Sequence, residues 1–478
     1  MTDQTVRSAS APSNGHAVVI GAGIAGLVAA QALSGTFARI TVIDRDTLPA
    51  EPGPRRGVPQ SKQVHGLLGG GASALEELFP GFQDELVAAG GALGDGQVDH
   101  HWFLDGFRLR PAPSDIPGYG ASRPLIESVL RNRVAALPGV RITDDIEVVG
   151  LEADGPDRVA GVRVTERRAD ARETVLSADL VVDASGRGSR AGVWLSGMGH
   201  PRPEESTVRI DLVYVTRHYA KRPELLGGRR LGVSVVPSPA LPRMGVVMPE
   251  EGDRYALLLA GMFGEEPPTD DAGMLEYARS LASPEVAAVI ESATPLDEPA
   301  RMRFPAGVRK HYEKLKHHPE GFVVMGDALC SFNPAYGQGM TVAAMEGVLL
   351  RRLLSQGSAQ LPGRFFRAAA KLVDTPWALA TGGDLRFPQV EGKRPPGDKL
   401  INKYLERYRA AASVDPGLAA TFLRVANLVE PPGRLLHPAN VLRVLRHAPK
   451  ATQAAQAAQA AQAAQAARHD PALAHEAE

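Results

Sequence analysis

The first ordered stretch of the chain begins with a short continuous run of apolar residues, the pattern of a strand that is buried on both faces. This run, Ala17–Ile20, lies in the segment His16–Ile20, which is followed by a small-residue segment of helical character, Gly21–Ser34, and by a strand-like segment, Arg39–Asp44. The order predicts a strand, a tight turn, a helix and a second strand. Residues 1–15 are polar and small, with no apolar signal core, and we interpret them as a disordered leader.

Further along the chain, alternating and helical patterns predict more elements. Strands are expected at 101–103, 107–109, 141–142, 147–151, 159–164, 180–183 and 321–325, with a strand-rich stretch at 205–305. Helices are expected at 73–79, 123–137, 272–293 and 339–353, and over most of 360–448. Residues 451–478 carry five Gln residues spaced by Ala-Ala, which drift around a helix of 3.6 residues per turn without forming a stripe. We interpret this tail as a frayed or disordered extension.

The composition limits the kinds of molecule that this protein is expected to bind. The chain has 478 residues, and 53 Lys and Arg nearly balance 54 Asp and Glu, which argues against nucleic acid. No apolar run is long enough to predict a membrane span. The single cysteine, Cys330, excludes an internal disulfide, fits a reducing cytoplasm, and is expected to be a packed residue. A small-molecule substrate is therefore favoured.

The first glycine signature is Gly21-Ala22-Gly23-Ile24-Ala25-Gly26, directly after the first apolar run. Its first glycine permits a tight turn, its second lets a pyrophosphate approach, and its third lets helix and strand pack closely. The helix N-terminus would present free N–H groups to phosphate. Asp44 ends the next strand, where a carboxylate accepts hydrogen bonds from an adenosine ribose. The signature predicts a dinucleotide site and does not distinguish NAD from FAD.

The second signature lies about three hundred residues later. Gly326-Asp327 follows an apolar strand, and Pro334, Gly337, Gly339 and Met340 follow in a turn that runs into a helix. Asp327 would lie at the carboxyl end of its strand, where it could accept a bond from a ribityl hydroxyl. The helix that starts near Gly339 would direct its positive end at flavin N1 and O2. The pair of signatures is typical of an FAD site.

The segments between the signatures offer weaker signals. Arg45, Arg55, Arg56, Gln60 and His65 follow the second strand, in or before a basic loop that either contacts the cofactor or is simply solvated. Arg123 begins a helix, where the helix dipole disfavours a cation, which hints at a phosphate or ribose contact. Asp183, at a strand end before the turn that holds Gly186, is expected to bind the N–H groups of that turn. The run Gly69-Gly70-Gly71 is interpreted as a flexible bend.

In this order, over residues 16–350, the motifs resemble the FAD-dependent monooxygenases of the para-hydroxybenzoate hydroxylase fold. Within that group, the segments 56–60 with His65, 183–189 and 332–340 look like the flavin epoxidases of polyether-antibiotic biosynthesis. In the segment 183–189 this chain differs from the family, because it has Ser185-Gly186 where the family usually has Asp-Gly. This difference weakens the inference that the segment has the family's role in NAD(P)H use.

The resemblance implies an α/β fold with a Rossmann-like FAD-binding domain of the GR2 type, interleaved with a mixed β-sheet substrate domain and followed by a helical C-terminal region. The expected domains are FAD-binding at 16–70, 121–200 and 306–355, substrate-binding at 71–120 and 201–305, and the helical region at 356–450. The tail follows at 451–478.

The resemblance also implies a reaction. Reduced FAD would react with O2, and the resulting C4a-hydroperoxyflavin would insert one oxygen atom into a lipophilic small molecule, such as a polyketide or terpenoid, by epoxidation or ring hydroxylation. Electrons would come from NAD(P)H or from a separate flavin reductase. The residues expected to contact the cofactor are Gly21, Gly23, Ile24, Ala25, Gly26, Asp44, Arg45, Arg56, Arg123, Asp183, Gly186, Gly326, Asp327, Pro334, Gly337, Gly339 and Met340. Candidate substrate contacts are His65, Trp102, Phe103, Tyr214, Met248, Phe263 and Phe332.

No metal ligands and no catalytic side chain are assigned, because no convincing acid–base pair stands out in the sequence. Two other hypotheses stay open. The first is an FAD-dependent reductase or dehydrogenase of carbon–carbon bonds, similar to geranylgeranyl reductases. The second is a flavin-binding module without turnover. Flavin halogenases share the fold, but their Trp-x-Trp-x-Ile-Pro segment is not found in the sequence.

Overall fold

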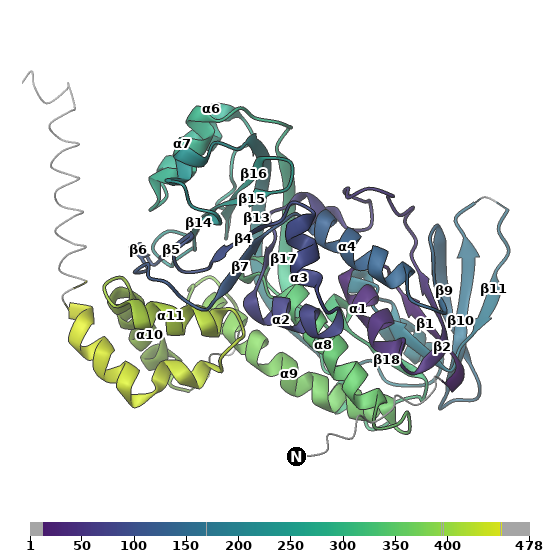
Figure 1. Cartoon of the computed structure of the whole chain (residues 1–478). Coiled ribbons are helices and arrows are strands. Elements are labelled where there is room, and N and C mark those ends of the chain that lie inside the picture. Colours follow the sequence, from purple (N-terminus) through teal and green to yellow (C-terminus); the bar gives the residue numbers. More distant parts are fainter. Residues whose placement is uncertain (1–12, 169, 393, 395, 450, 452–478) are drawn as a thin grey trace, which may run out of the picture.

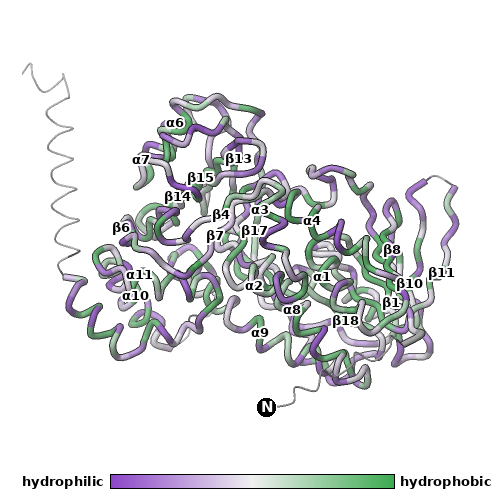
Figure 2. Tube along the Cα trace, in the orientation of Figure 1, coloured by the Kyte–Doolittle hydropathy of each residue, from purple (hydrophilic) through white to green (hydrophobic). Residues whose placement is uncertain are grey.

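The computed structural model describes residues 13–449 and 451, except for 169, 393 and 395 (Figure 1). Its first layer is a five-stranded parallel sheet in the order β18-β12-β1-β2-β8. The strands are β1 (Ser13–Ile20), β2 (Phe37–Ile43), β8 (Val140–Thr143), β12 (Leu180–Asp183) and β18 (Phe322–Val324). Hydrophobic residues run along these strands, as expected for a parallel sheet that is covered on both faces (Figure 2).

Helices α1 (Ile24–Leu33) and α4 (Arg123–Ala135) pack on this sheet, and α8 (Gly339–Leu354) packs against α1. Their apolar residues share one buried cluster with the strands, including Leu27, Leu130 and Leu350. The predicted β-α-β unit, the helix after residue 123 and the helix after Gly339 are therefore confirmed.

The second layer is an eight-stranded mixed sheet in the order β19-β17-β13-β16-β15-β14-β5-β6. Its strands are β5 (His100–Leu104), β6 (Phe107–Arg108), β13 (Glu205–Ala220), β14 (Gly232–Val235), β15 (Arg243–Glu250), β16 (Arg254–Gly261), β17 (Ala300–Lys310) and β19 (Cys330–Ser331). Helices α6 (Asp271–Arg279) and α7 (Pro284–Ser292) lie over one face of this sheet. The single helix expected at 272–293 is thus two helices, because Ser283 caps a new helix that begins at Pro284.

Two small antiparallel sheets complete the β-structure. One is β11-β10-β9, made of β9 (Ile146–Ala153), β10 (Val159–Glu166) and β11 (Thr174–Ser177). The other is β3-β7-β4, made of β3 (Gly66–Leu67), β4 (Ala92–Asp95) and β7 (Pro117–Gly120).

The glycine run that we interpreted as a flexible bend is instead the first turn of α2 (Gly69–Leu78), which is followed by α3 (Phe82–Ala88). The glycines are needed for close packing. A Cβ on Gly70 would lie 2.9 Å from the carbonyl oxygens of Asn427 and Leu428, and one on Gly71 would lie 2.5 Å from Thr341 Oγ1.

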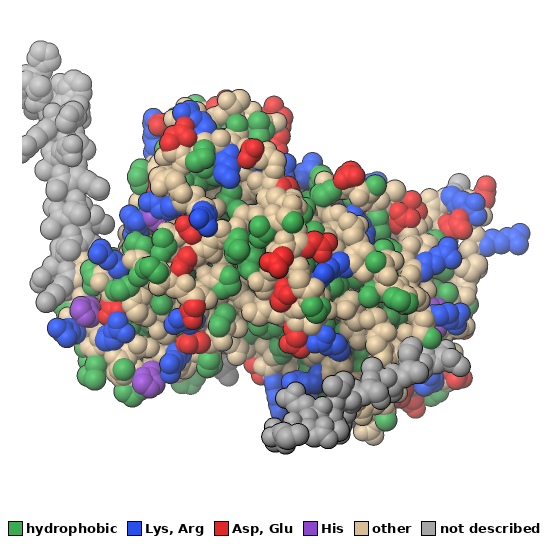
Figure 3. Space-filling view, in the orientation of Figure 1, with side chains coloured by type: hydrophobic (Ala, Val, Ile, Leu, Met, Phe, Trp, Pro, Cys, Tyr) green, Lys and Arg blue, Asp and Glu red, His purple; other side chains and the backbone are tan. Residues whose placement is uncertain are grey.

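The C-terminal region is helical, as predicted. It contains α9 (Leu361–Asp384), α10 (Asp398–Ala412) and α11 (Pro416–Ala426), and residues 438–449 form a further helix. Within the described part of the chain, no helix is both long and apolar enough to cross a membrane. Figure 3 shows charged side chains of both signs scattered over the visible face. The predictions for residues 1–12 and for the Ala/Gln tail from 452 onward lie outside the described residues.

Candidate cofactor and substrate site

The glycines of the first signature bring helix α1 close to the parallel sheet. Gly21 has φ +100°, and a Cβ there would lie 2.7 Å from the carbonyl oxygen of Ala184 on the neighbouring strand end. A Cβ on Gly26 would overlap with the carbonyl oxygen of Gly21. Glycine at both positions therefore permits the tight turn and leaves the N-terminus of α1 facing an open space.

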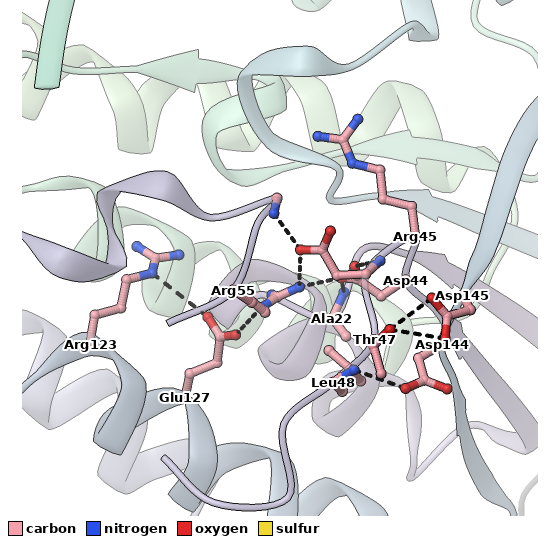
Figure 4. Close-up of polar contacts among 12 residues, drawn as sticks. Ala22, Asp44, Arg45, Thr47, Leu48, Arg55, Arg123, Glu127, Asp144 and Asp145 are labelled. Atoms are coloured by element: carbon pink, nitrogen blue, oxygen red, sulfur yellow. Dashed lines mark hydrogen bonds and ion pairs between the residues drawn. The ribbon is translucent and has the colours of Figure 1, made fainter. Parts of the chain in front are cut away.

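A chain of buried charges lies beside this turn (Figure 4). Asp44 Oδ2 accepts hydrogen bonds from Ala22 N–H at 2.7 Å and from Arg55 Nη1 at 2.9 Å. Arg55 Nε donates to Glu127 Oε1 at 2.7 Å, and Arg123 Nε lies 3.7 Å from Glu127 Oε2. Burial disfavours the charge on Arg55, but Glu127 and Asp44 together raise the pKa of its guanidinium. Arg55 is therefore a permanent cation held between two carboxylates.

The residues around the turn fit a dinucleotide. A Cβ on Gly23 would come within 3.6 Å of Arg55 Nη2 and 3.9 Å of Arg123 Nη2, so two guanidinium groups border the open side of the turn. Arg123 Nε is buried without a hydrogen-bond partner among the described residues. A bound pyrophosphate would supply acceptors at this place.

The second signature forms the opposite wall. Gly326 has φ +66°, and a Cβ there would lie 2.6 Å from Cβ of Ala25, so the two signatures touch. Burial raises the pKa of Asp327, against the positive charges of Arg123 and Arg187. Gly337 has φ +65°, and α8 begins two residues later at Gly339, with its N-terminus beside Asp327. This wall offers a carboxyl group and free backbone N–H groups side by side.

One cavity of about 780 Å³ runs from these glycine turns to the mixed sheet. The wall contributed by the sheet is mostly apolar, with Leu212, Tyr214, Met244, Val246, Met248, Leu258, Met302 and Phe304 among its lining residues. Arg187 lies over the Phe304 ring, 4.1 Å from its centroid, where the two halves of the cavity meet.

His65 lines the cavity as a neutral ring. Burial and the charge of Arg123 lower its pKa to about 3. Its Nδ1 lies 2.8 Å from the carbonyl oxygen of Gln63, and because a carbonyl only accepts, Nδ1 carries the proton. Nε2 is therefore an acceptor, so at neutral pH His65 accepts a hydrogen bond through this atom and has no proton to give from it.

Most of the predicted contact residues meet in this cavity. The lining includes Gly21, Gly23, Ile24, Ala25, Asp44, Arg45, Arg123, Gly186, Asp327, Pro334, Gly337, Gly339 and Met340 from the cofactor set. It also includes His65, Trp102, Tyr214, Met248 and Phe332 from the substrate set.

Six of the predicted residues do not line the cavity. Gly26 and Gly326 lie at backbone contacts, and both carboxyl oxygens of Asp183 bind its own turn through Ser185 and Ser189. Arg56 is exposed outside the cavity, whereas its neighbour Arg55 lines it. Phe103 points to the opposite face of β5 from Trp102, as strand alternation requires, and joins another core cluster. Phe263, past the end of β16, packs against Phe387.

Other residues of the site were not predicted. Glu127 is buried in α4 and orients both arginines, but in the sequence it is one acidic residue among many. Tyr336, Arg187 and Phe304 line the cavity. Tyr336 and Arg187 lie inside quoted motifs, which is the signal that could have identified them, whereas Phe304 has no such signal.

Comparisons with known proteins agree with this geometry. Residues 15–359 match the family of the FAD binding domain. Protein Rv3254 of Mycobacterium tuberculosis (strain ATCC 25618 / H37Rv) is 35% identical over 435 residues, which span 87% of this chain and 90% of that protein. Squalene monooxygenase 1,1 of Brassica napus is 23% identical over 343 residues, which span 70% of this chain and 62% of that protein.

Among solved structures, a flavoprotein/dehydrogenase from Cytophaga hutchinsonii has the same fold. It aligns with a TM-score of 0.64 at 18% identity over 92% of this chain and 99% of that one. The matched domain covers both glycine signatures and the mixed sheet between them, and it supports FAD as the cofactor. The chain belongs to the FAD-dependent monooxygenase family that this FAD binding domain defines.

Proposed function

We propose that this protein inserts one atom of O2 into a lipophilic small molecule, by alkene epoxidation or by ring hydroxylation. The observation that carries the proposal is a cavity in which the two glycine signatures face an apolar sheet wall. When bound, FAD would supply the oxygen activation. Substrate would lie against the methionine and leucine side chains of β15, β16 and β17.

In this proposal, the side chains of the protein bind and position the cofactor. Arg55 and Arg123 would bind the pyrophosphate, Asp44 the adenosine ribose, and Asp327 the ribityl chain. The N-terminus of α8 would stabilise negative charge on the reduced ring. The sheet wall would exclude water from the reacting atoms.

A lipophilic substrate is favoured by the composition of the wall. Met244, Met248 and Met302 are flexible, polarisable side chains that adapt to irregular apolar shapes. His65 Nε2 provides one acceptor for a substrate hydroxyl at the edge of this surface. The similarity to squalene monooxygenase, whose named substrate is a lipophilic hydrocarbon, supports the same class.

The proposal is tested with the FAD-loaded protein, NADPH and ¹⁸O₂, with and without an added flavin reductase. A panel of lipophilic alkenes and phenols is supplied, and the products are examined by mass spectrometry. We expect a product that has gained one heavy oxygen atom. Reduction of a carbon–carbon double bond without oxygen uptake would instead establish the reductase hypothesis. A requirement for the added reductase would identify a separate protein as the electron source.

A further inference from the structure

The loop that carries the second glycine signature is held from behind by the C-terminal region. Asn333 Nδ2 donates to Asp384 Oδ1 at 2.7 Å, and the Tyr336 hydroxyl donates to the same oxygen at 3.0 Å. Asp384 is the last residue of α9 and is 3% exposed. Asn333 and Tyr336 line the cavity and Asp384 does not, so Asp384 acts on the cavity through these two side chains.

The backbone of α9 is shaped for this contact. A Cβ on Gly383 would collide with the Tyr336 hydroxyl, whereas a Cβ on Gly382 would meet nothing within 4 Å. Glycine inside a helix costs about 1 kcal/mol relative to alanine. At Gly383 the Tyr336 ring occupies the space that a side chain would need, so the loop and the helix are in direct contact.

We propose that Asp384 is a positioning residue for the flavin end of the site, which holds residues 333–337 so that the backbone of Gly337 and Gly339 faces the cavity. The inference rests on the proposed role of this loop in binding the flavin ring. It does not depend on the identity of the substrate.

The charges around Asp384 give the contact a pH dependence. Burial raises the pKa of Asp384 to about 6, although the bonds from Asn333 and Tyr336 favour the carboxylate. Burial and Asp384 raise the pKa of Tyr336 well above its usual value, so this hydroxyl stays a donor. Arg386, just past α9, and Arg409, on α10, also face Tyr336, and both are paired with Asp105. As the pH falls through about 6, Asp384 is protonated and becomes a weaker acceptor for both donors.

The first test compares Gly383→Ala with the matched variant Gly382→Ala. We expect Gly383→Ala to weaken FAD binding about tenfold or more and to shift the visible spectrum of bound FAD, because Tyr336 is displaced. Gly382→Ala should leave both unchanged. Equal FAD affinities and spectra for the two variants would overturn the proposal.

The second test follows FAD affinity against pH for the wild type, for Asp384→Asn, and for Asp415→Asn as a control. Asp415 is equally buried in the same region, where it caps α11 and binds Arg443. The wild type and the control should lose affinity as the pH falls through about 6, whereas Asp384→Asn, which keeps an acceptor oxygen but cannot titrate, should lack this transition. A transition that persists in Asp384→Asn would contradict the proposal.

A third measurement separates this inference from the proposed function. Hydrogen–deuterium exchange of the backbone amides of residues 333 and 335–337 in the FAD-free protein should be faster in Gly383→Ala than in Gly382→Ala. If the wild type fails to bind FAD, the proposed function fails, while this exchange difference still reports on the positioning of the loop. Equal exchange in the two variants would show that α9 does not hold the loop.

Discussion

At the residue scale, the cofactor end of the site depends on buried charges, and most of these charges have a partner of opposite sign. Arg55 comes from a loop without periodicity, so the sequence could not distinguish it from Arg56 next to it. In the structure the two arginines differ, because Arg55 forms ion pairs with the buried carboxylates of Asp44 and Glu127, whereas Arg56 is exposed. Motif residues such as Gly21 and Asp327 could be placed from the sequence, since their roles depend on the local turn. A residue whose role depends on partners that are distant in the sequence could not be placed in this way.

We predict that Arg55→Met destabilises the FAD-free protein by about 3–5 kcal/mol, because it removes the cation that pairs with the buried carboxylates of Asp44, Asp46 and Glu127. The Arg55, Asp44 and Glu127 side chains are all less than 10% exposed, so water cannot replace the lost partner. Urea unfolding measures the effect. Arg56→Met is the control, since an exposed side chain should change the free energy of unfolding by no more than about 0.5 kcal/mol. Similar losses in both variants would contradict this account.

Glu346 leads to a second residue-scale prediction. It is fully buried on α8, its Oε2 accepts the Gly326 N–H at 2.6 Å, and burial raises its pKa to about 8. Between about pH 4.5, the ordinary pKa of a glutamate, and about pH 8, the folded state keeps a proton on Glu346 that the unfolded state releases. The free energy of unfolding therefore falls as the pH rises through this range.

Glu346→Gln resembles the protonated form and cannot titrate. Its free energy of unfolding should therefore rise relative to the wild type by up to about 1.4 kcal/mol per pH unit across this window. Denaturant unfolding of the FAD-free protein at several pH values measures this difference. A difference that does not change with pH would show that Glu346 is ionised in the folded protein.

At the element scale, helix α2 shows how a distant segment determines local structure. Its first turn is three glycines, which alone favour a bend. The C-terminal region supplies the missing cap, because Asn427 Oδ1 accepts the Gly69 N–H and the Asn427 carbonyl accepts the Gly70 N–H, both at 2.9 Å. These partners are more than 350 residues apart, so no local pattern could predict the helix start.

Asn427→Ala should therefore lower the free energy of unfolding by about 1–2 kcal/mol, the usual cost of losing a helix cap. Asn402→Ala is the comparison, since Asn402 makes a short-range bond to Asp398 within α10. Thermal unfolding of both variants checks the prediction. If the two midpoints shift alike, the contact with Asn427 does not stabilise α2.

At the scale of the whole molecule, the sequence predicted the layers better than the cavity between them. The parallel sheet, the mixed sheet and the C-terminal helices follow from local apolar patterns and from the two signatures. The cavity needs strands from both sheets and a loop that is held by α9, and these meet only in three dimensions. Trp102 lines the cavity and Phe103 does not, because only one face of β5, which pairs with β14, meets the cavity.

The central claim is that the cavity supports oxygen insertion by bound FAD, and rapid-mixing absorbance spectroscopy tests it most directly. The FAD-loaded protein is reduced without oxygen, with NADPH or with dithionite in separate runs, and is then mixed with oxygenated buffer. The account predicts a transient, blue-shifted flavin absorbance before the oxidised spectrum returns, because the apolar wall keeps water away from the reacting ring. Reoxidation in a single step, both with and without lipophilic substrate, would contradict it.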